Sequence, residues 1–548
     1  MMTATETTAP EKPRVRVPGR SVRMSAGSSS YAAASQFNRD IGLWRPPLKS
    51  ADAEILRDAR LVRARARSLV RDHPYAKQAV RISRLGVVGK KLTLRLKPDY
   101  KFLGIEHEEA GRWAREFQRL WELIAHGPRF WIDAGRRMDF TQLMGLVHDL
   151  EFVEGEAFIA AEWDQNRPWK SCFQLVDNDR IENPHGAPDT SFLKGGIALD
   201  SLSAPLGYHV RNGHPADIGL ISIRDNLTWS YVPRETAWGR PVMMHVFDPG
   251  RAAQTRGISE FTTVIRAMRM GQEYAETALA AAVLQASYVA VLTSQQNYKE
   301  ALEVISASSD PTTEASIADL ALDHLEAAQA YYENAEVRFN GLKIPHLFPG
   351  EDLSLKTPGQ NAAGYGEFQG HAIKTYAAGL GTDPISTSQN YSDVNYSSAR
   401  MSVANNWRNY ETRRRRHISH VGLQIVSAVM EEVLHRRILK MPAGLKEHDL
   451  YDALPALARG TFITAGAPML DPVKERQGDK LGWQLGLDTL DELASEEGQD
   501  WQELIDQKAE EIAYMRARGV PLPDQPVMPL GGDDEDDDGK SKKPKEQQ

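Results

Sequence analysis

Cysteine is almost absent from this chain. Cys172 is the only cysteine among 548 residues, so no disulfide can form within the chain and no cysteine-rich zinc site can be built. The N-terminal segment also lacks the apolar run that a secretion signal requires. These absences predict a protein of a reducing compartment, and 41% hydrophobic residues are enough for an ordinary globular core.

An excess of positive charge is missing as well. Lysine and arginine total 66 against 74 aspartates and glutamates, which gives a net charge of −8. This balance excludes a chain that grips nucleic acid over its whole surface, because such binding depends on the neutralisation of many phosphates. Any contact with DNA is therefore expected to be local or weak.

Long hydrophobic runs are also lacking. Residues 277–298 carry no charge and approach the length of a bilayer span. Their alanines, together with Gln285, Ser287, Gln295 and Gln296, make the stretch too polar to cross a membrane. We expect a buried helix here and no membrane partner.

The standard nucleotide-binding motifs are not found. Residues 86–91 read G-x-x-G-K-K, without the spacing or the Ser/Thr of a P-loop, and residues 364–370 are one residue too long for a dinucleotide fingerprint. The histidines His371, His417 and His420 are interpreted as surface or packing residues. We assign no catalytic residue, no cofactor and no metal, and do not expect an enzyme.

One carboxylate group keeps a catalytic alternative open. Glu151, Glu154, Glu156 and Glu162 fall in a segment that alternates like a strand, where residues two apart share a face. Glu154 and Glu156 could therefore pair for acid–base or glycosidase chemistry. Exposed or turn glutamates explain the pattern more simply, so a hydrolase is kept only as an alternative.

The first half of the chain mixes helices with short strands. Apolar periodicity predicts a helix over residues 51–85, interrupted at Pro74, and further helices over 106–124 and 140–150. Between residues 152 and 246 the pattern changes to short strands separated by Gly, Pro, Asn and Asp. The fold class is therefore α+β.

The second half is dominated by long helices. One helix over residues 259–293 would span about 50 Å, and another is expected from 399 to 439. An irregular segment, a short helix over 366–379 and a polar loop lie between them. Helices that are long and only modestly apolar usually pack against another copy of the chain.

A run of four arginines marks the later long helix. These residues could face DNA or pair with a neighbouring subunit, and the sequence leaves both possibilities open. The run consists of Arg413, Arg414, Arg415 and Arg416.

Six segments, taken together, resemble the portal proteins of lambda-type tailed phages. Each segment alone would be a weak signal, but their order and spacing between about residues 40 and 515 are specific. They are FVEGEAFIA (152–160), QLVDNDRI (174–181), GRPVMMHVFDPGRAAQTRGIS (239–259), the Pro349-Gly350 step, NYSSAR (395–400) and DPVKE (471–475).

The resemblance implies a ring-forming portal fold with long stem and crown helices and a mixed α/β wing. Members form a homo-oligomer of about twelve subunits at one capsid vertex, where double-stranded DNA passes during packaging and ejection. The implied partners are the terminase large subunit, the head–tail adaptor and the major capsid or scaffold protein. The implied location is the virion, after assembly in the host cytoplasm. Another head–tail connector or minor capsid protein is the alternative.

The resemblance also implies a division of the chain and a set of residues near DNA. The segments that it implies are wing (41–257), first stem helix (258–293), clip (294–360), second stem helix (361–380), tunnel loop (381–398) and long helix with remaining wing and crown (399–520). A disordered arm (1–40) and a disordered acidic tail (521–548) lie outside the resemblance and are predicted from composition alone. The polar loop offers weak hydrogen bonds without a lattice of charges. Its DNA-proximal candidates, with their flanking cations, are Lys374, Gln389, Asn390, Tyr391, Asn395, Tyr396 and Arg400.

Overall fold

The computed structural model describes most of the chain apart from the ends and the segment between the long helices. Most of the arm, most of the clip, residues 288–298 of the uncharged stretch and the acidic tail lie outside the described residues. Those described are 32–34, 39–217, 226–287, 326, 330, 337–339, 342–344, 362–392, 395–446, 450–464, 466–467 and 471–520.

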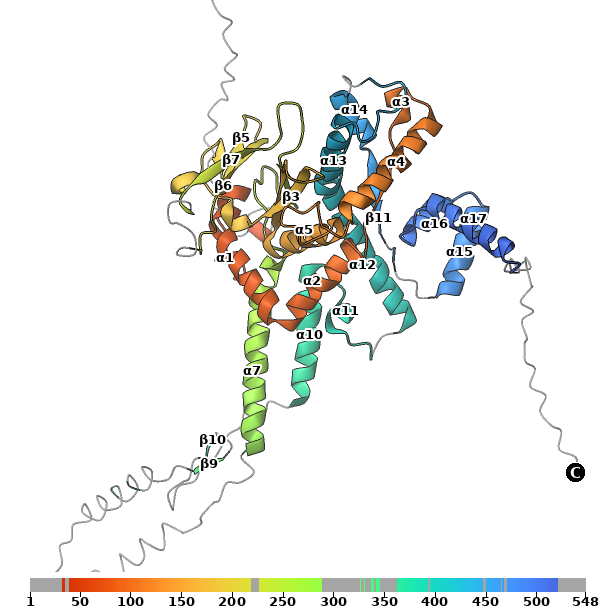
Figure 1. The fold of residues 1–548 in the computed structure, drawn as a ribbon. Helices are drawn as coiled ribbons and strands as arrows, with labels where there is room; N and C mark the ends of the chain where they lie inside the picture. Colours follow the sequence, from red (N-terminus) through yellow and green to blue (C-terminus); the bar gives the residue numbers. More distant parts are fainter. Residues whose placement is uncertain are drawn as a thin grey trace, which may run out of the picture.

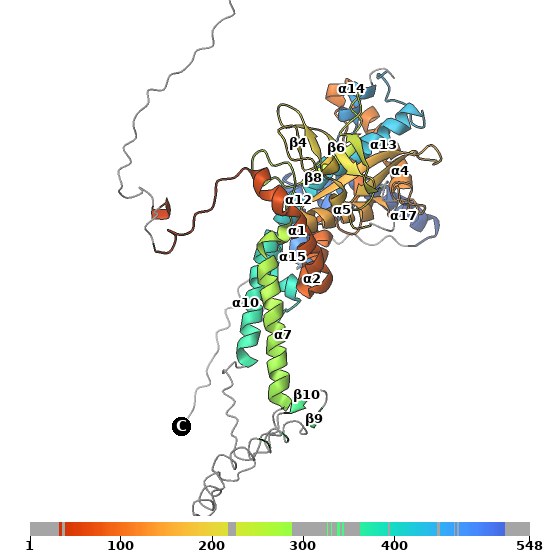
Figure 2. The same ribbon diagram turned by 90° about the vertical axis from the view of Figure 1, so that its left-hand side faces the viewer.

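The described residues form a mixed helical and stranded body from which two helices project (Figure 1). This confirms the α+β class. Helices α7 (Ile265–Ser287) and α10 (Ala362–Leu380) leave the body side by side, and both views show them in this arrangement (Figure 2). No helix among the described residues is both long enough and apolar enough to span a membrane.

The helices of the N-terminal half follow the predicted periodicity. The break at Pro74 is confirmed, because His73 is extended and proline occupies the first turn of the next helix. Helix α5 begins with a capping box, in which Asp139 accepts a hydrogen bond from the Gln142 amide at 2.7 Å. The helices are η1 (Ala32–Ala34), α1 (Ala51–Asp72), α2 (Pro74–Val87), α3 (Tyr100–Leu103), α4 (His107–Ala125) and α5 (Phe140–Glu154).

Two antiparallel sheets lie beside these helices. Strand β2 is the centre of a three-stranded sheet of order β3-β2-β8, and a second sheet has the order β4-β5-β6-β7. Two further pairs are β1 with β11 and β9 with β10. The strands are β1 (Thr93–Leu96), β2 (Glu156–Trp163), β3 (Ser171–Val176), β4 (Leu193–Lys194), β5 (Ile197–Leu199), β6 (Pro205–Arg211), β7 (Trp229–Pro233), β8 (Met243–Phe247), β9 (Val337–Phe339), β10 (Leu342–Ile344) and β11 (Gly460–Ile463). The short helices η2 (Asn178–Arg180) and η3 (Pro184–Gly186) follow β3.

One strand prediction is wrong at its beginning. Phe152, Val153 and Glu154 are the last turn of α5 and do not belong to β2. Gly155 ends the helix with a φ of 95°, a conformation that glycine adopts easily and that terminates helices. The helix continues that far because Phe152 and Val153 bury their side chains against Phe261 and Val264.

The second half contains the long helices. The helix predicted from residue 399 begins at Tyr396 and passes through a π-helical turn, η6, before it ends at His435. Its predicted apolar face, which includes Val421, Ile425, Val429 and Val433, is buried in the main core. The elements are η4 (Glu260–Thr263), α7 (Ile265–Ser287), α10 (Ala362–Leu380), α11 (Pro384–Ser388), α12 (Tyr396–His417), η6 (Ile418–Gly422), α13 (Leu423–His435), α14 (Leu450–Leu457), α15 (Pro472–Gln484), α16 (Leu490–Glu496) and α17 (Trp501–Ala517).

The main core joins segments that are far apart in sequence. Helix α4 buries Trp113, Phe117 and Trp121, the face that its periodicity predicts. The Phe140 ring stacks on that of Phe462 in β11, with the ring centroids 5.0 Å apart. Burial of each such side chain contributes about 1.5–3 kcal/mol, so this core holds both halves of the chain in one body.

Candidate functional site

The projecting helices are antiparallel and contact each other along their length. Near the body, the Tyr376 hydroxyl on α10 donates a hydrogen bond to the Ala267 carbonyl on α7 at 3.2 Å. Farther out, the rings of Tyr274 and Phe368 lie 4.5 Å apart. Gly271 lies under the Tyr376 hydroxyl, where a Cβ atom would collide with it. The close approach of the two helices therefore depends on this glycine.

The outer part of helix α7 is exposed, contrary to the buried helix predicted for residues 277–298. Leu279 and Val283 are exposed, with Leu279 at 67% of its accessible surface. They belong to the uncharged stretch that was expected to form a buried helix. Near the body Met268 is fully buried, but farther out the described residues do not cover the apolar side chains of α7.

The polar segment after α10 is more ordered than the predicted loop. It contains the short helix α11, and its last residues already belong to α12. Asp383 caps α11, because its carboxylate accepts hydrogen bonds from the Ser386 amide at 2.8 Å and the Ser386 hydroxyl at 2.9 Å. The Ser402 hydroxyl of α12 also donates to Asp383. The base of the segment is thus fixed to the helix that follows it.

The tip of this segment carries the candidate DNA-proximal residues. Gln389, Asn390, Tyr391 and Asn395 are all exposed. Gln389 has a φ of 55°, which turns the chain at the end of α11. The Asn390 side chain accepts a hydrogen bond from the Ser392 amide at 3.0 Å, which orders the turn locally. An exposed polar surface of amides and hydroxyls results.

The flanking candidates are placed on helices. Lys374 lies on α10 and Arg400 on α12, and both side chains are exposed. Tyr396 is the first residue of α12. The role of all seven candidates toward DNA stays a prediction.

The four arginines do not act as one surface. Arg413 pairs with Glu260 at 2.8 Å, and Arg416 pairs with Glu151 and with Asp248, each at 2.5 Å. Arg414 donates hydrogen bonds to the backbone carbonyls of Val87 (2.9 Å) and Gly86 (2.7 Å). Arg415 is exposed. Three of the four side chains are therefore engaged within the chain, and only Arg415 keeps a guanidinium at the surface.

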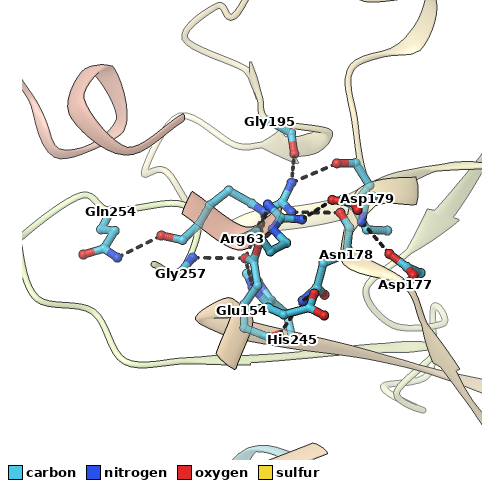
Figure 3. A network of polar contacts seen from close by, with 12 residues as sticks. Arg63, Glu154, Asp177, Asn178, Asp179, Gly195, His245, Gln254 and Gly257 are labelled. Carbon is cyan, nitrogen blue, oxygen red and sulfur yellow. Dashed lines mark hydrogen bonds and ion pairs between the residues drawn. The ribbon is translucent and has the colours of Figure 1, made fainter. Parts of the chain in front are cut away.

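Glu154 and Glu156, the glutamates of the catalytic alternative, lie in a buried network of ion pairs. Figure 3 labels Glu154 and His245 within this network. Glu156 is fully buried and accepts hydrogen bonds from Arg256 Nε at 2.8 Å and from the Gly257 amide at 3.0 Å. His245 Nε2 lies 3.0 Å from Glu156 Oε2, the oxygen that also accepts from Gly257. Glu154 pairs with Arg67 at 2.7 Å.

This environment fixes the charge of Glu156. Burial opposes its ionisation, but the ion pair with Arg256 and the hydrogen bond from His245 outweigh burial and hold the pKa of Glu156 far below its usual value. A general acid needs a pKa near the working pH. Glu156 is therefore poorly suited to act as a general acid, and its negative charge instead balances the cations of the ion-pair network.

A second buried group was not recognised from the sequence. His148 and Glu151 on α5 meet His417 at the end of α12. Burial, together with Arg416 and Arg413, lowers the pKa of His417 to about 3, and burial with His417 and Arg413 lowers that of His148 well below its usual value. Burial raises the pKa of Glu151, although Arg413 and Arg416 oppose this. The i, i+3 spacing of His148 and Glu151 was the only local signal.

Comparison with known proteins gives a family match. The model of the family described as phage portal protein, lambda family, matches residues 37–414. The portal protein of Escherichia phage N15 is 30% identical over 496 residues, which cover 90% of this chain and 91% of that protein. Portal protein B of Escherichia phage lambda is 31% identical over 497 residues, with the same coverage of each chain.

Among solved structures, a chain in the neck of an empty GTA particle, computed with C6 symmetry, is 13% identical. The alignment covers 84% of this chain and 94% of that chain, with a TM-score of 0.38.

Proposed function

Because the chain belongs to the lambda family of phage portal proteins, we propose that copies of it form a ring at one capsid vertex. The ring, of about twelve subunits, is the channel through which double-stranded DNA is packaged and later ejected. The observation that carries the proposal is the family match over residues 37–414, which includes both projecting helices and the polar segment after them.

The uncovered apolar surface of the projecting helices supports assembly. Met270, Leu279 and Val283 on α7 and Phe368 on α10 are all exposed in the single chain. Large exposed apolar groups usually mark an interaction surface, and copies of the same helices around a ring axis would cover them. We therefore assign α7 to the first stem helix and α10 to the second.

The C-terminal helices support the same conclusion. Neither α15 nor α17 has a buried residue within the chain. The unit formed by α15, α16 and α17 buries too little of its own surface to be stable without a packing partner. We assign this unit to the crown, where a second subunit would pack against it. Its exposed apolar side chains are Val473, Leu481, Trp483, Leu485, Leu487, Leu490, Ile505, Ile512 and Tyr514.

A DNA channel has a particular electrostatic requirement. Each phosphate neutralised by a cation strengthens binding through counterion release, so a wall rich in fixed cations would retard a sliding duplex. The polar tip formed by Gln389, Asn390, Tyr391 and Asn395 carries no cation at these positions, so it avoids this retardation of the duplex. Lys374 and Arg400 add a limited positive charge beside it.

The remaining segments are assigned to partners. The clip, residues 294–360, binds the terminase large subunit during packaging and the head–tail adaptor afterwards. The wing, residues 41–257, faces the major capsid or scaffold protein. The protein assembles in the host cytoplasm and ends in the virion. The terminase supplies the chemical energy, so this chain needs no catalytic residue of its own.

Complementation of particles that lack this chain tests the proposal. Triple replacement of Gln389, Asn390 and Tyr391 by alanine should leave rings intact and reduce the DNA packaged per particle. Gln507→Ala, at an exposed position on α17, is the matched control and should package normally. Unchanged packaging in the triple variant would remove the loop from the mechanism, and full particles without this chain would contradict the function.

A further inference from the structure

Three side chains of the metal-binding types converge where α5 crosses the junction of α12 and η6. His148 is 0% exposed, and Glu151 and His417 are each 2% exposed. A nitrogen of each histidine and a carboxylate oxygen of Glu151 all lie within 4.8 Å of one another. The ligands come from distant parts of the chain, since His148 and His417 are 269 positions apart.

The distances are close to those of a first coordination sphere. His148 Nδ1 lies 3.3 Å from His417 Nε2, and His417 Nε2 lies 3.8 Å from Glu151 Oε2. Zn–N bonds of 2.0–2.1 Å in a tetrahedral site place two ligand nitrogens about 3.3 Å apart. The pair of imidazoles already has this spacing, and the carboxylate needs only a small side-chain rotation.

Hydrogen bonds among the described residues do not satisfy every polar atom of His148, Glu151 and His417. One hydrogen bond can join the two imidazoles in either tautomer, but Glu151 Oε2 has no hydrogen-bond partner among the described residues. Its other oxygen is used by Arg416. A buried carboxylate oxygen without a partner costs free energy, and a cation is the group that would satisfy it.

The surrounding charges permit a cation. Glu151, Asp248 and Glu260 carry three negative charges, and they are matched by only two guanidiniums, those of Arg413 and Arg416. The nearby Arg84 is paired with Asp149 at 2.9 Å. Arg413 and Arg416 therefore oppose a cation at the two imidazoles less than unpaired guanidiniums would, because each is paired with a carboxylate.

We propose that His148, Glu151 and His417 hold one divalent metal ion of the zinc class, which joins α5 to the junction of α12 and η6. Two imidazoles and one carboxylate form a donor set that suits zinc, with water as the fourth ligand. The ion would fix the long helix to the body at the point where its π-helical turn begins. Its role is structural, because the group is buried.

The affinity should be lower than that of most zinc sites. Metal-bound histidines usually donate their second N–H to a carboxylate or carbonyl, which strengthens the site. His148 Nε2 and His417 Nδ1 have no such acceptor in the described part of the chain. Zinc should therefore be removable by a chelator without denaturation.

Metal analysis of the full, tag-free chain tests the proposal. After chelation, loading with zinc and removal of free ion, the wild-type chain should retain one zinc ion per chain and melt at a higher temperature than the metal-free form. His148→Gln and His417→Gln should each weaken zinc binding by at least about 100-fold. His371→Gln, an exposed position on α10, is the matched control and should bind like the wild type.

A measurement without substitutions covers the case in which the variants fail to fold. X-ray absorption of the zinc-loaded wild-type chain should show two imidazole ligands and one carboxylate oxygen. No retained zinc, equal zinc in all the variants, or a coordination shell without imidazole would each overturn the proposal.

Discussion

Arg256 is the residue whose loss should destabilise the body most clearly. It is buried and forms the ion pair with Glu156, in which Nη2 and the carboxylate oxygen lie 2.6 Å apart. It also donates hydrogen bonds to the carbonyls of Ile181 at 3.0 Å and Gly195 at 2.5 Å. The change Arg256→Met keeps much of the side-chain volume and removes the charge and all donors.

The expected magnitude follows from the charge left behind. Removal of one partner of a buried ion pair costs about 3–5 kcal/mol, because the other charge stays buried without compensation. Arg63 remains 3.7 Å from Glu156, and His245 remains within hydrogen-bond distance. These groups offset part of the loss, so we expect the lower end of the range, about 3 kcal/mol.

Arg251→Met is the matched control. Arg251 lies in the same segment and pairs with Glu54 at 2.7 Å, but the two side chains are 52% and 62% exposed. An exposed pair contributes about 0–1 kcal/mol. Urea unfolding followed by circular dichroism should separate the two variants by at least about 2 kcal/mol. Equal stabilities would refute the conclusion that burial makes the Glu156 network essential.

Three further predictions concern pH, the stem and the arginine run. The folded chain holds the pKa of Glu156 below its usual 4.5. The stability advantage of the native chain over Glu156→Gln should therefore be complete above about pH 5 and decline in acid, because the unfolded chain then takes up the proton. An advantage independent of pH would contradict this. In thermal unfolding, Gly271→Ala should destabilise the chain by about 1–3 kcal/mol, because the new methyl group collides with Tyr376. Gly366→Ala, in open space on α10, should stabilise the chain by up to about 1 kcal/mol. A Gly271→Ala variant more stable than the Gly366→Ala variant would show that the helices do not pack closely. Arg415→Ala should leave the fold unchanged and weaken ring assembly or DNA retention, and normal rings with full DNA retention would exclude an external role for the run.

Local periodicity was sufficient to predict much of the fold. The buried face of α4, the break at Pro74 and the long helix that ends at His435 all follow from patterns within a few turns of chain. The error at Phe152–Glu154 arose because a strand pattern and the last turn of a buried helix are similar over so few residues. Gly155 was the signal that could have separated them.

The arginine run shows what helix geometry adds to composition. Successive residues of a helix are about 100° apart, so four consecutive side chains cannot share a face. Arg413 and Arg416 point to acidic partners on the body, while Arg414 reaches the end of α2. The sequence was enough to predict that the four arginines point in different directions. It could not identify their ion-pair partners, since Glu151 and Glu260 are distant in the chain.

The buried histidines could not be brought together from the sequence. Only the tertiary packing of α12 on α5 places His417 beside His148. For the short helix α11 a signal did exist, because Asp383 followed by Pro384 is a typical helix start. It was obscured by the polar composition of the surrounding loop.

Native mass measurement with negative-stain imaging of the purified chain tests the central claim most directly. The account predicts rings with a central channel and a mass near 730 kDa, that of about twelve copies of the 61.1 kDa chain. A stable monomer that forms no ring, even with scaffold protein present, would contradict the proposed function as a portal channel.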